Sequence, residues 1–185
     1  MTLSRRTFAL GLVAGTSLLA GCGNGIGTTN DQKIDARVDQ TLRFMFLNYP
    51  NTRGLAEKST GMLIMPLVTE AGLGLGGSFG RGALRVNDIT VDYYSQTSAS
   101  AGFQIGAQQY AHVLFFMTDD ALLEFRRSQG WAAGADIEYA LRDQGDSVRA
   151  ATTTSLSPVI AAVFGQAGFR AGATIEGTKY RRIIP

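Results

Sequence analysis

The sequence is poor in the residues that most enzymatic chemistry uses. Its 185 residues include one cysteine, Cys22, and one histidine, His112. A lone cysteine excludes an internal disulfide. A Ser-His-Asp triad would have to use His112, but this residue lies in an apolar run that favours a buried core histidine, and no serine lies in a nucleophile-elbow motif. We therefore predict a non-enzymatic protein without a metal ion or other cofactor.

Two pairs of carboxylates are the remaining candidates for chemistry. Asp119 and Asp120 lie at a predicted helix start, where negative charge stabilises the helix dipole. Asp136 and Glu138 would share one face of a strand and could bind a cation there, although solvated polar positions of this kind are commoner. Neither pair establishes a catalytic site. A lipid hydrolase that uses His112 or Asp136 stays an alternative with little support.

Long apolar runs are also few, and the most prominent one lies near the N-terminus. Phe8 to Ala20 form an apolar stretch of 13 residues, which is too short to span a bilayer because a span takes about 20 residues. Arg5 and Arg6 precede it, as in a twin-arginine export signal. We therefore predict that residues 1–21 are an export signal peptide that is removed.

The signal ends in Leu19-Ala20-Gly21-Cys22, which resembles a bacterial lipobox. In such a motif the cysteine is acylated and the chain is cut before it. Several acyl chains anchor a protein permanently, so Cys22 is the predicted lipidation site and excludes a histidine–cysteine metal site. Gly23 follows it instead of aspartate, which favours the outer membrane of the cell envelope. Residues 22–30 would be the lipidated cysteine and a flexible tether, and residues 31–185 the domain.

The mature chain also lacks an excess of charge of either sign. The signal holds two of the 17 basic residues and none of the 15 acidic ones, which leaves 15 of each. Nucleic-acid-binding proteins normally carry a basic surplus or a basic stripe. The sequence therefore predicts no nucleic-acid partner.

Glycine, in contrast, is abundant, and it is concentrated between Gly61 and Val86. Gly72-Leu73-Gly74-Leu75-Gly76 alternates with the period of a strand and leaves one face nearly bare. Glycine in a strand marks a bend, a bulge or the close approach of another backbone or a ligand. We therefore predict that something lies flat on this surface.

The same stretch contains a formal G-x-G-x-x-G motif at residues 72–77. A dinucleotide site would need a helix to begin there, because the helix N-terminus holds the pyrophosphate. Ser78-Phe79-Gly80-Arg81-Gly82 follows instead, which is poor helix material. Glycines that let a sheet twist and turn back are the favoured interpretation.

Three segments have the pattern of helices. Residues 31–47 repeat apolar side chains at helical spacing and end before a proline. Their mixed charge favours a helix packed on its own domain over one that lies on a membrane. A short helix is expected within residues 52–60, and another begins after Thr118 and ends near Gly130.

The rest of the chain is rich in strand patterns. Ala101 to Met117 is the strongest, with its later part buried on both faces and a bulge expected near Gln108-Gln109. Pro66, in the apolar run before the glycines, indicates an edge strand, a bulge or a strand end. Residues 95–100 could be an irregular strand or a loop. Asn87-Asp88 and residues 143–146 are predicted turns. Further runs are expected at 131–141, 148–154, 159–164 and 168–176. The predicted fold is a single α+β domain, a curved, mostly antiparallel sheet, sandwich-like or partly closed into a barrel, covered by the N-terminal and mid-chain helices.

Between Leu55 and Gly177 the chain resembles the SYLF domain, which occurs in eukaryotic phosphoinositide-binding proteins and in bacterial secreted lipoproteins. The resemblance rests on segments that occur in a fixed order: 61–66, 71–77 with 80–82, 100–108, 134–136, and 167–172 with 175–177. It implies binding of phospholipid, with phosphoinositides as the eukaryotic ligand. It does not identify the lipid that a bacterial member binds.

We therefore expect a membrane-anchored, non-enzymatic phospholipid-binding lipoprotein. Apolar surface would take acyl chains while arginines bind phosphate, bidentately where the geometry allows. The expected head-group residues are the paired arginines and the two beside the bare glycine face: Arg126, Arg127, Arg181, Arg182, Arg81 and Arg85. Arg126 and Arg127 equally suit the end of the expected helix, where the helix dipole favours positive charge. Arg181 and Arg182 also suit a solvated chain end. The alternative is a structural or protein-docking lipoprotein of the envelope that has no specific lipid ligand and uses the flat glycine face.

Overall fold

The computed structural model describes residues 29–134, 137–142, 157–165 and 175–185. Several predicted features lie outside these ranges: the export signal with Arg5 and Arg6, Cys22, the turn at 143–146, the run at 148–154 and most of the run at 168–176. The described elements are α1 (Thr29–Asn48), α2 (Thr52–Lys58), β1 (Gly61–Val86), β2 (Ile89–Phe116), α3 (Asp119–Arg127), β3 (Trp131–Ala132), β4 (Glu138–Arg142), β5 (Val159–Phe164) and β6 (Lys179–Ile183).

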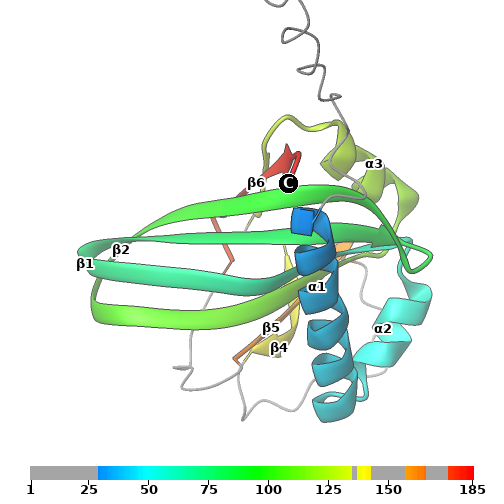
Figure 1. The fold of residues 1–185 in the computed structure, drawn as a ribbon, viewed down its shortest axis with the longest axis horizontal. Coiled ribbons are helices and arrows are strands. Elements are labelled where there is room, and N and C mark those ends of the chain that lie inside the picture. Colours follow the sequence, from blue (N-terminus) through cyan, green and yellow to red (C-terminus); the bar gives the residue numbers. More distant parts are fainter. Residues whose placement is uncertain (1–28, 135–136, 143–156, 166–174) are drawn as a thin grey trace, which may run out of the picture.

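The sheet is built on one long antiparallel ribbon of β1 and β2. The two strands are joined at Asn87 and Asp88, whose φ angles of 50° and 63° suit a tight hairpin turn. Pairing then runs from Val86 opposite Ile89 as far as Gly61 opposite Phe116. The ribbon bends back on itself, with its glycine-rich middle at the far end from the helices (Figure 1). The bend divides each of the two strands into a first half and a second half, and both halves belong to the sheet.

The remaining strands extend the two halves of the ribbon separately. The first half of β2 pairs with β6, which pairs with β3, and the second half pairs with β5. β5 pairs with β4 in the one parallel contact among the described strands. The result is a curled, mostly antiparallel sheet, so the predicted α+β fold is confirmed.

Apolar side chains fill both faces of this curled sheet. Alternate residues of one strand face opposite sides, so Leu63 packs in a cluster with α3 while Ile64 packs in a cluster with α1. Phe125 anchors α3 in the first cluster, and Met45 anchors α1 in the second. The interpretation of the N-terminal helix as packed on its own domain is confirmed (Figure 1).

The glycines explain how the ribbon can fold so tightly. A Cβ at Gly82 would collide with the carbonyl oxygen of Ile64 and lie 2.6 Å from Met65 Sδ, and a Cβ at Gly80 would lie 3.0 Å from the carbonyl oxygen of Leu67. The backbone that lies on these glycines thus belongs to the first half of β1 itself. No helix begins after Gly77, because the chain continues as strand β1, and this agrees with the rejection of the dinucleotide site.

Three details of the strand predictions are corrected. No register shift lies at Gln108-Gln109 itself, where a bulge was expected. One shift lies between Leu73 and Gly74, opposite Ile105 and Gly102 of β2, and another lies between Met65 and Val68, where β1 has the extra residue around Pro66. Proline there lacks the N–H that a regular ladder needs. Residues 95–100 are regular strand within β2. The run at 131–141 is not one strand, because β3 and β4 are separate and pair with different partners.

Candidate functional site

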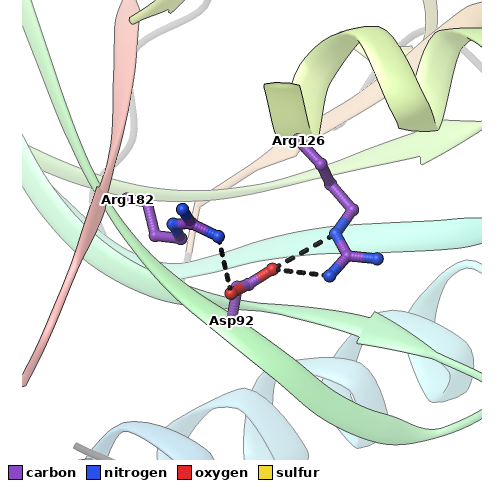
Figure 2. A network of polar contacts seen from close by, with 3 residues as sticks. All are labelled: Asp92, Arg126 and Arg182. Atoms are coloured by element: carbon purple, nitrogen blue, oxygen red, sulfur yellow. Dashed lines mark hydrogen bonds and ion pairs between the residues drawn. The ribbon is translucent and has the colours of Figure 1, made fainter. Parts of the chain in front are cut away.

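Three charged side chains from three elements meet at the end of the sheet next to α3 (Figure 2). Asp92 of β2 accepts a hydrogen bond from Arg126 Nε at 3.2 Å and forms an ion pair with Arg126 Nη2 at 3.1 Å. Its other carboxylate oxygen lies 3.5 Å from Arg182 Nη1 of β6. We call these three residues the Asp92 cluster.

Local structure determines where Arg126 lies. The Thr118 hydroxyl caps α3 by accepting from the Ala121 N–H at 3.2 Å. The helix ends in two arginines, where positive charge is favoured by the helix dipole. Phe125 is fully buried, and the centroid of its ring lies 4.7 Å from the centroid of the Tyr94 ring. This anchor holds the last turn of α3 against β2 and directs Arg126 to Asp92.

Strand pairing positions Arg182. It lies opposite Tyr94 in the antiparallel register of β6 and β2, two residues from Asp92 and on the same face of β2. Arg181 points to the other face of β6, so only one arginine of each sequential pair reaches the cluster. The sequence alone missed Asp92, because a single aspartate in a strand carries no signal of what will face it.

The electrostatics of the cluster favour a further anion. The Asp92 side chain is 14% exposed, whereas Arg126 and Arg182 are 39% and 62% exposed. The cluster carries two positive charges against one negative charge. Each guanidinium has five N–H donors, and those that Asp92 does not use can bind a phosphate or carboxylate bidentately.

Tyr94 forms the buried floor beside this cluster. Its hydroxyl has no hydrogen-bond partner among the described residues. Burial, followed by the charge of Asp92, raises the pKa of Tyr94 to about 12, while Arg182 and Arg126 act in the opposite direction. The phenol is therefore neutral at physiological pH and can donate one hydrogen bond.

The other predicted arginines have different surroundings. Arg85 forms an ion pair with Asp39 of α1 at 2.6 Å, and its side chain is only 13% exposed. Arg81 lies over the ring of Phe79, with 5.8 Å from Cζ to the ring centroid. Arg127 is exposed at the end of α3. The structure thus brings Arg126 and Arg182 together and holds Arg85 beneath α1.

The interior of the curled sheet contains a separate polar network. His112 is fully buried, and its Nε2 lies 2.8 Å from the Tyr180 hydroxyl. Burial lowers the pKa of His112 to about 3. The interpretation as a core histidine with one hydrogen bond is confirmed. Ser78 accepts from Gln96 Nε2 at 2.9 Å on the same face of the sheet.

A pocket of about 310 Å³ lies on the other side of α3. Asp120 and Glu124 line it, one helical turn apart, together with Trp131 and residues at the start of β5. Within the described ranges, no three histidine, cysteine or acidic side chains are grouped so that they could hold a metal ion. None of the described helices is long and apolar enough to cross a membrane.

Comparison with protein families matches part of the chain to a known family. Residues 97–182 match the family model described as "Ysc84: Las17-binding protein actin regulator". The matched region begins within β2 and ends within β6, so it contains α3 and both arginines of the Asp92 cluster. A comparison with curated proteins found no match.

Proposed function

Because the chain belongs to the SYLF-domain family, to which the Ysc84 model corresponds, we propose that it is a non-enzymatic binding module for the head groups of anionic phospholipids. The Asp92 cluster is the observation that carries this proposal. Two arginines from α3 and β6 converge on one shielded carboxylate and keep unused donors. Such a group can hold a phosphate without chemical change to either partner.

In the proposed mechanism a phosphate enters between the two guanidinium groups at the exposed side of the cluster. Arg182 is the more exposed of the two and makes the first contact. Arg126 contributes a second contact from a more fixed position, because Asp92 already binds two of its nitrogen atoms. Arg127 and Arg181 are nearby in sequence and add long-range attraction. Arg85 is not included because Asp39 neutralises it.

Membrane attachment is proposed to come from acylation of Cys22 after export by the signal around Arg5 and Arg6. Several acyl chains suffice to anchor the protein, and the domain would then lie at a lipid surface of the cell envelope, where the outer membrane is the proposed site. A weak head-group site is sufficient there, because tethering raises the effective concentration of the ligand.

The proposal is tested with the chain from Gly23 onward, which begins after the acylated cysteine. Its partition onto phosphatidylglycerol vesicles is compared with that onto phosphatidylcholine vesicles. We expect preference for phosphatidylglycerol, and a loss of about tenfold or more in the double variant Arg126→Glu, Arg182→Glu, because each charge-assisted phosphate contact contributes about 1.5–3 kcal/mol.

A matched control has the same change in net charge at a distance from the cluster. Arg37 and Arg43 are exposed on α1, so Arg37→Glu, Arg43→Glu should retain most of the preference for phosphatidylglycerol. Equal losses in the two double variants would show that only overall charge matters. Equal binding of the parent chain to both kinds of vesicle would reject the head-group proposal.

A protein partner is the second candidate. The matched family model describes a Las17-binding actin regulator, and a docking function needs no lipid head group. This function predicts a stable partner that is recovered by cross-linking in the envelope, without co-purifying phospholipid and without preference for anionic vesicles. The vesicle experiment therefore separates the two candidates.

A further inference from the structure

Two large apolar side chains project from the bent end of the β1–β2 ribbon, away from the helices. Leu75 is 79% exposed and Phe79 is 51% exposed. They are four residues apart in one strand, so they lie on the same face, about 13 Å apart. Arg81 continues this face, and its guanidinium lies over the Phe79 ring.

The register holds these side chains outward. Ser78, between Phe79 and Gly77, points to the opposite face, where its hydroxyl lies 2.7 Å from that of Ser98 and accepts from Gln96. A strand has a side-chain period of two, so this buried network forces Phe79 to the outside. The exposure of Leu75 and Phe79 is thus built into the pairing of β1 with β2.

The charge of this end has one sign. No acidic residue occurs between Ala71 and Asn87, or between Tyr93 and Thr118 on the partner strand. Glu70, at the base of the bent end, accepts a hydrogen bond from Gln108 Nε2 at 2.8 Å. Along β1, Arg81 lies two residues after Phe79, whereas Glu70 lies five residues before Leu75. Apolar residues followed by arginine and no carboxylate complement the interface of an anionic bilayer.

We propose that this end of the ribbon, residues 74–81, is a second membrane contact that buries Leu75 and Phe79 in the bilayer interface and places Arg81 at lipid phosphate. The inference rests on the proposed function in that the protein works at a lipid surface. It goes further because it uses no residue of the Asp92 cluster.

A bilayer fits this surface better than a protein partner does. A stable protein interface buries at least about 1,000 Å² with a close-packed centre, whereas Leu75 and Phe79 are the two large exposed apolar side chains among those that the structure describes at this end. Insertion into lipid needs no complementary partner surface, because each apolar side chain contributes through its own transfer from water. Phe79 with Arg81 stacked on its ring is suited to the boundary between head groups and acyl chains.

The test uses the processed, anchored lipoprotein, extracted from cell membranes and reconstituted into phosphatidylcholine–phosphatidylglycerol vesicles. Leu75→Cys and, separately, Phe79→Cys are labelled with an environment-sensitive fluorophore. Quenching by lipids that carry a nitroxide on the acyl chain reports contact with the bilayer interior. The parent chain, in which Cys22 is proposed to be blocked by acylation, gives the labelling background.

Matched controls place the same fluorophore at exposed apolar positions elsewhere. Ile89, 67% exposed at the opposite end of the ribbon, and Leu47, 77% exposed on α1, serve this purpose. We expect quenching at Leu75 and Phe79 to exceed that at both controls several-fold, with a blue-shifted emission. The proposal would be overturned if quenching at Leu75 and Phe79 were no greater than at Ile89 and Leu47. A protein partner that covers this end of the ribbon would give that result.

Quenching in these samples, combined with the vesicle partition of the chain from Gly23 onward, distinguishes failure of this inference from failure of the proposed function. Arg126→Glu, Arg182→Glu should leave quenching at Leu75 unchanged, because these residues lie at the other end of the ribbon. Quenching at Leu75 without any preference of the parent chain for phosphatidylglycerol would support membrane contact by the ribbon and reject the head-group site. Preference for phosphatidylglycerol without quenching at Leu75 would support the head-group site and reject membrane contact by the ribbon.

Discussion

Gly82 lies directly against the carbonyl group of Ile64, although both residues belong to the same strand. A Cβ at position 82 would lie 2.9 Å from the carbonyl carbon of Ile64 and would collide with its oxygen. Because the obstacle is backbone, no change of rotamer could relieve the overlap. This contact keeps the two halves of β1 together at a distance that only glycine allows.

Gly82→Ala should therefore destabilise the fold by about 3 kcal/mol, at the upper end of the cost of overpacking a core. Urea unfolding followed by circular dichroism measures this change in the free energy of unfolding. The contact would be less restrictive than inferred if Gly82→Ala unfolded at the same urea concentration as the parent.

Gly54→Ala is the matched control for that measurement. Gly54 lies within α2, and a Cβ there would meet no atom within 4 Å. Alanine in a helix interior is favoured over glycine by about 0.5–1 kcal/mol. We expect a slight gain in stability at position 54, opposite in sign to the change at position 82.

The ion pair between Arg85 and Asp39 should act in folding and not in lipid binding. A double-mutant cycle with Arg85→Gln and Asp39→Asn should give a coupling free energy of about 1 kcal/mol, because the pair is only partly shielded from solvent. Partition onto phosphatidylglycerol vesicles should be unchanged in Arg85→Gln. If this variant bound vesicles more weakly at unchanged stability, Arg85 would be one of the residues that bind the head group.

Removing the Asp92 charge should strengthen binding to anionic lipid. Asp92 competes with an incoming phosphate for the same two guanidinium groups, so Asp92→Asn should tighten binding to phosphatidylglycerol vesicles a few-fold. Weaker binding would mean that Asp92 serves mainly to position the arginines.

The same variant makes a spectroscopic prediction. Asp92 raises the pKa of Tyr94, after the larger effect of burial, whereas Arg182 and Arg126 lower it. Asp92→Asn should therefore lower the pKa of Tyr94 from about 12, which ultraviolet titration of tyrosinate measures. A matched titration of Tyr94→Phe identifies the signal of this residue among the other tyrosines.

Burial of His112 should make the protein less stable in acid. Its pKa falls from 6.5 to about 3 on folding because the buried imidazole cannot be charged. Below pH 6.5 the unfolded chain gains a proton that the folded chain does not, so the stability falls with decreasing pH, by at most about 1.4 kcal/mol per pH unit, until about pH 3.

His112→Gln isolates this contribution. Glutamine can still hydrogen-bond the Tyr180 hydroxyl but does not titrate, so the difference in free energy of unfolding between parent and variant should shrink or change sign between pH 6.5 and pH 4.5. Parallel pH profiles of the two proteins would show that His112 is protonated equally in the folded and unfolded states.

The helices were predictable because their signals are local. Residue 118 caps a helix whose first turn is acidic and whose last turn is basic, and α3 lies there. The turn at Asn87-Asp88 was predictable for the same reason, since both residues tolerate positive φ. The proline at position 66 left an edge strand, a bulge and a strand end equally open, and the two glutamines at 108–109 carry no local signal that decides. Only the pairing shows that β1 accommodates an extra residue between Met65 and Val68.

The sequence alone determined the strand periodicity, the helix limits, the resemblance to the SYLF domain and the presence of a glycine surface that another backbone could approach. These properties depend on residues close together along the chain. The tertiary structure alone decided that the approaching backbone is the first half of β1, that Arg126 and Arg182 share Asp92, and that Arg85 is neutralised beneath α1. Each of these contacts joins residues that are distant in sequence, and their meeting depends on how the ribbon bends and how the sheet curls.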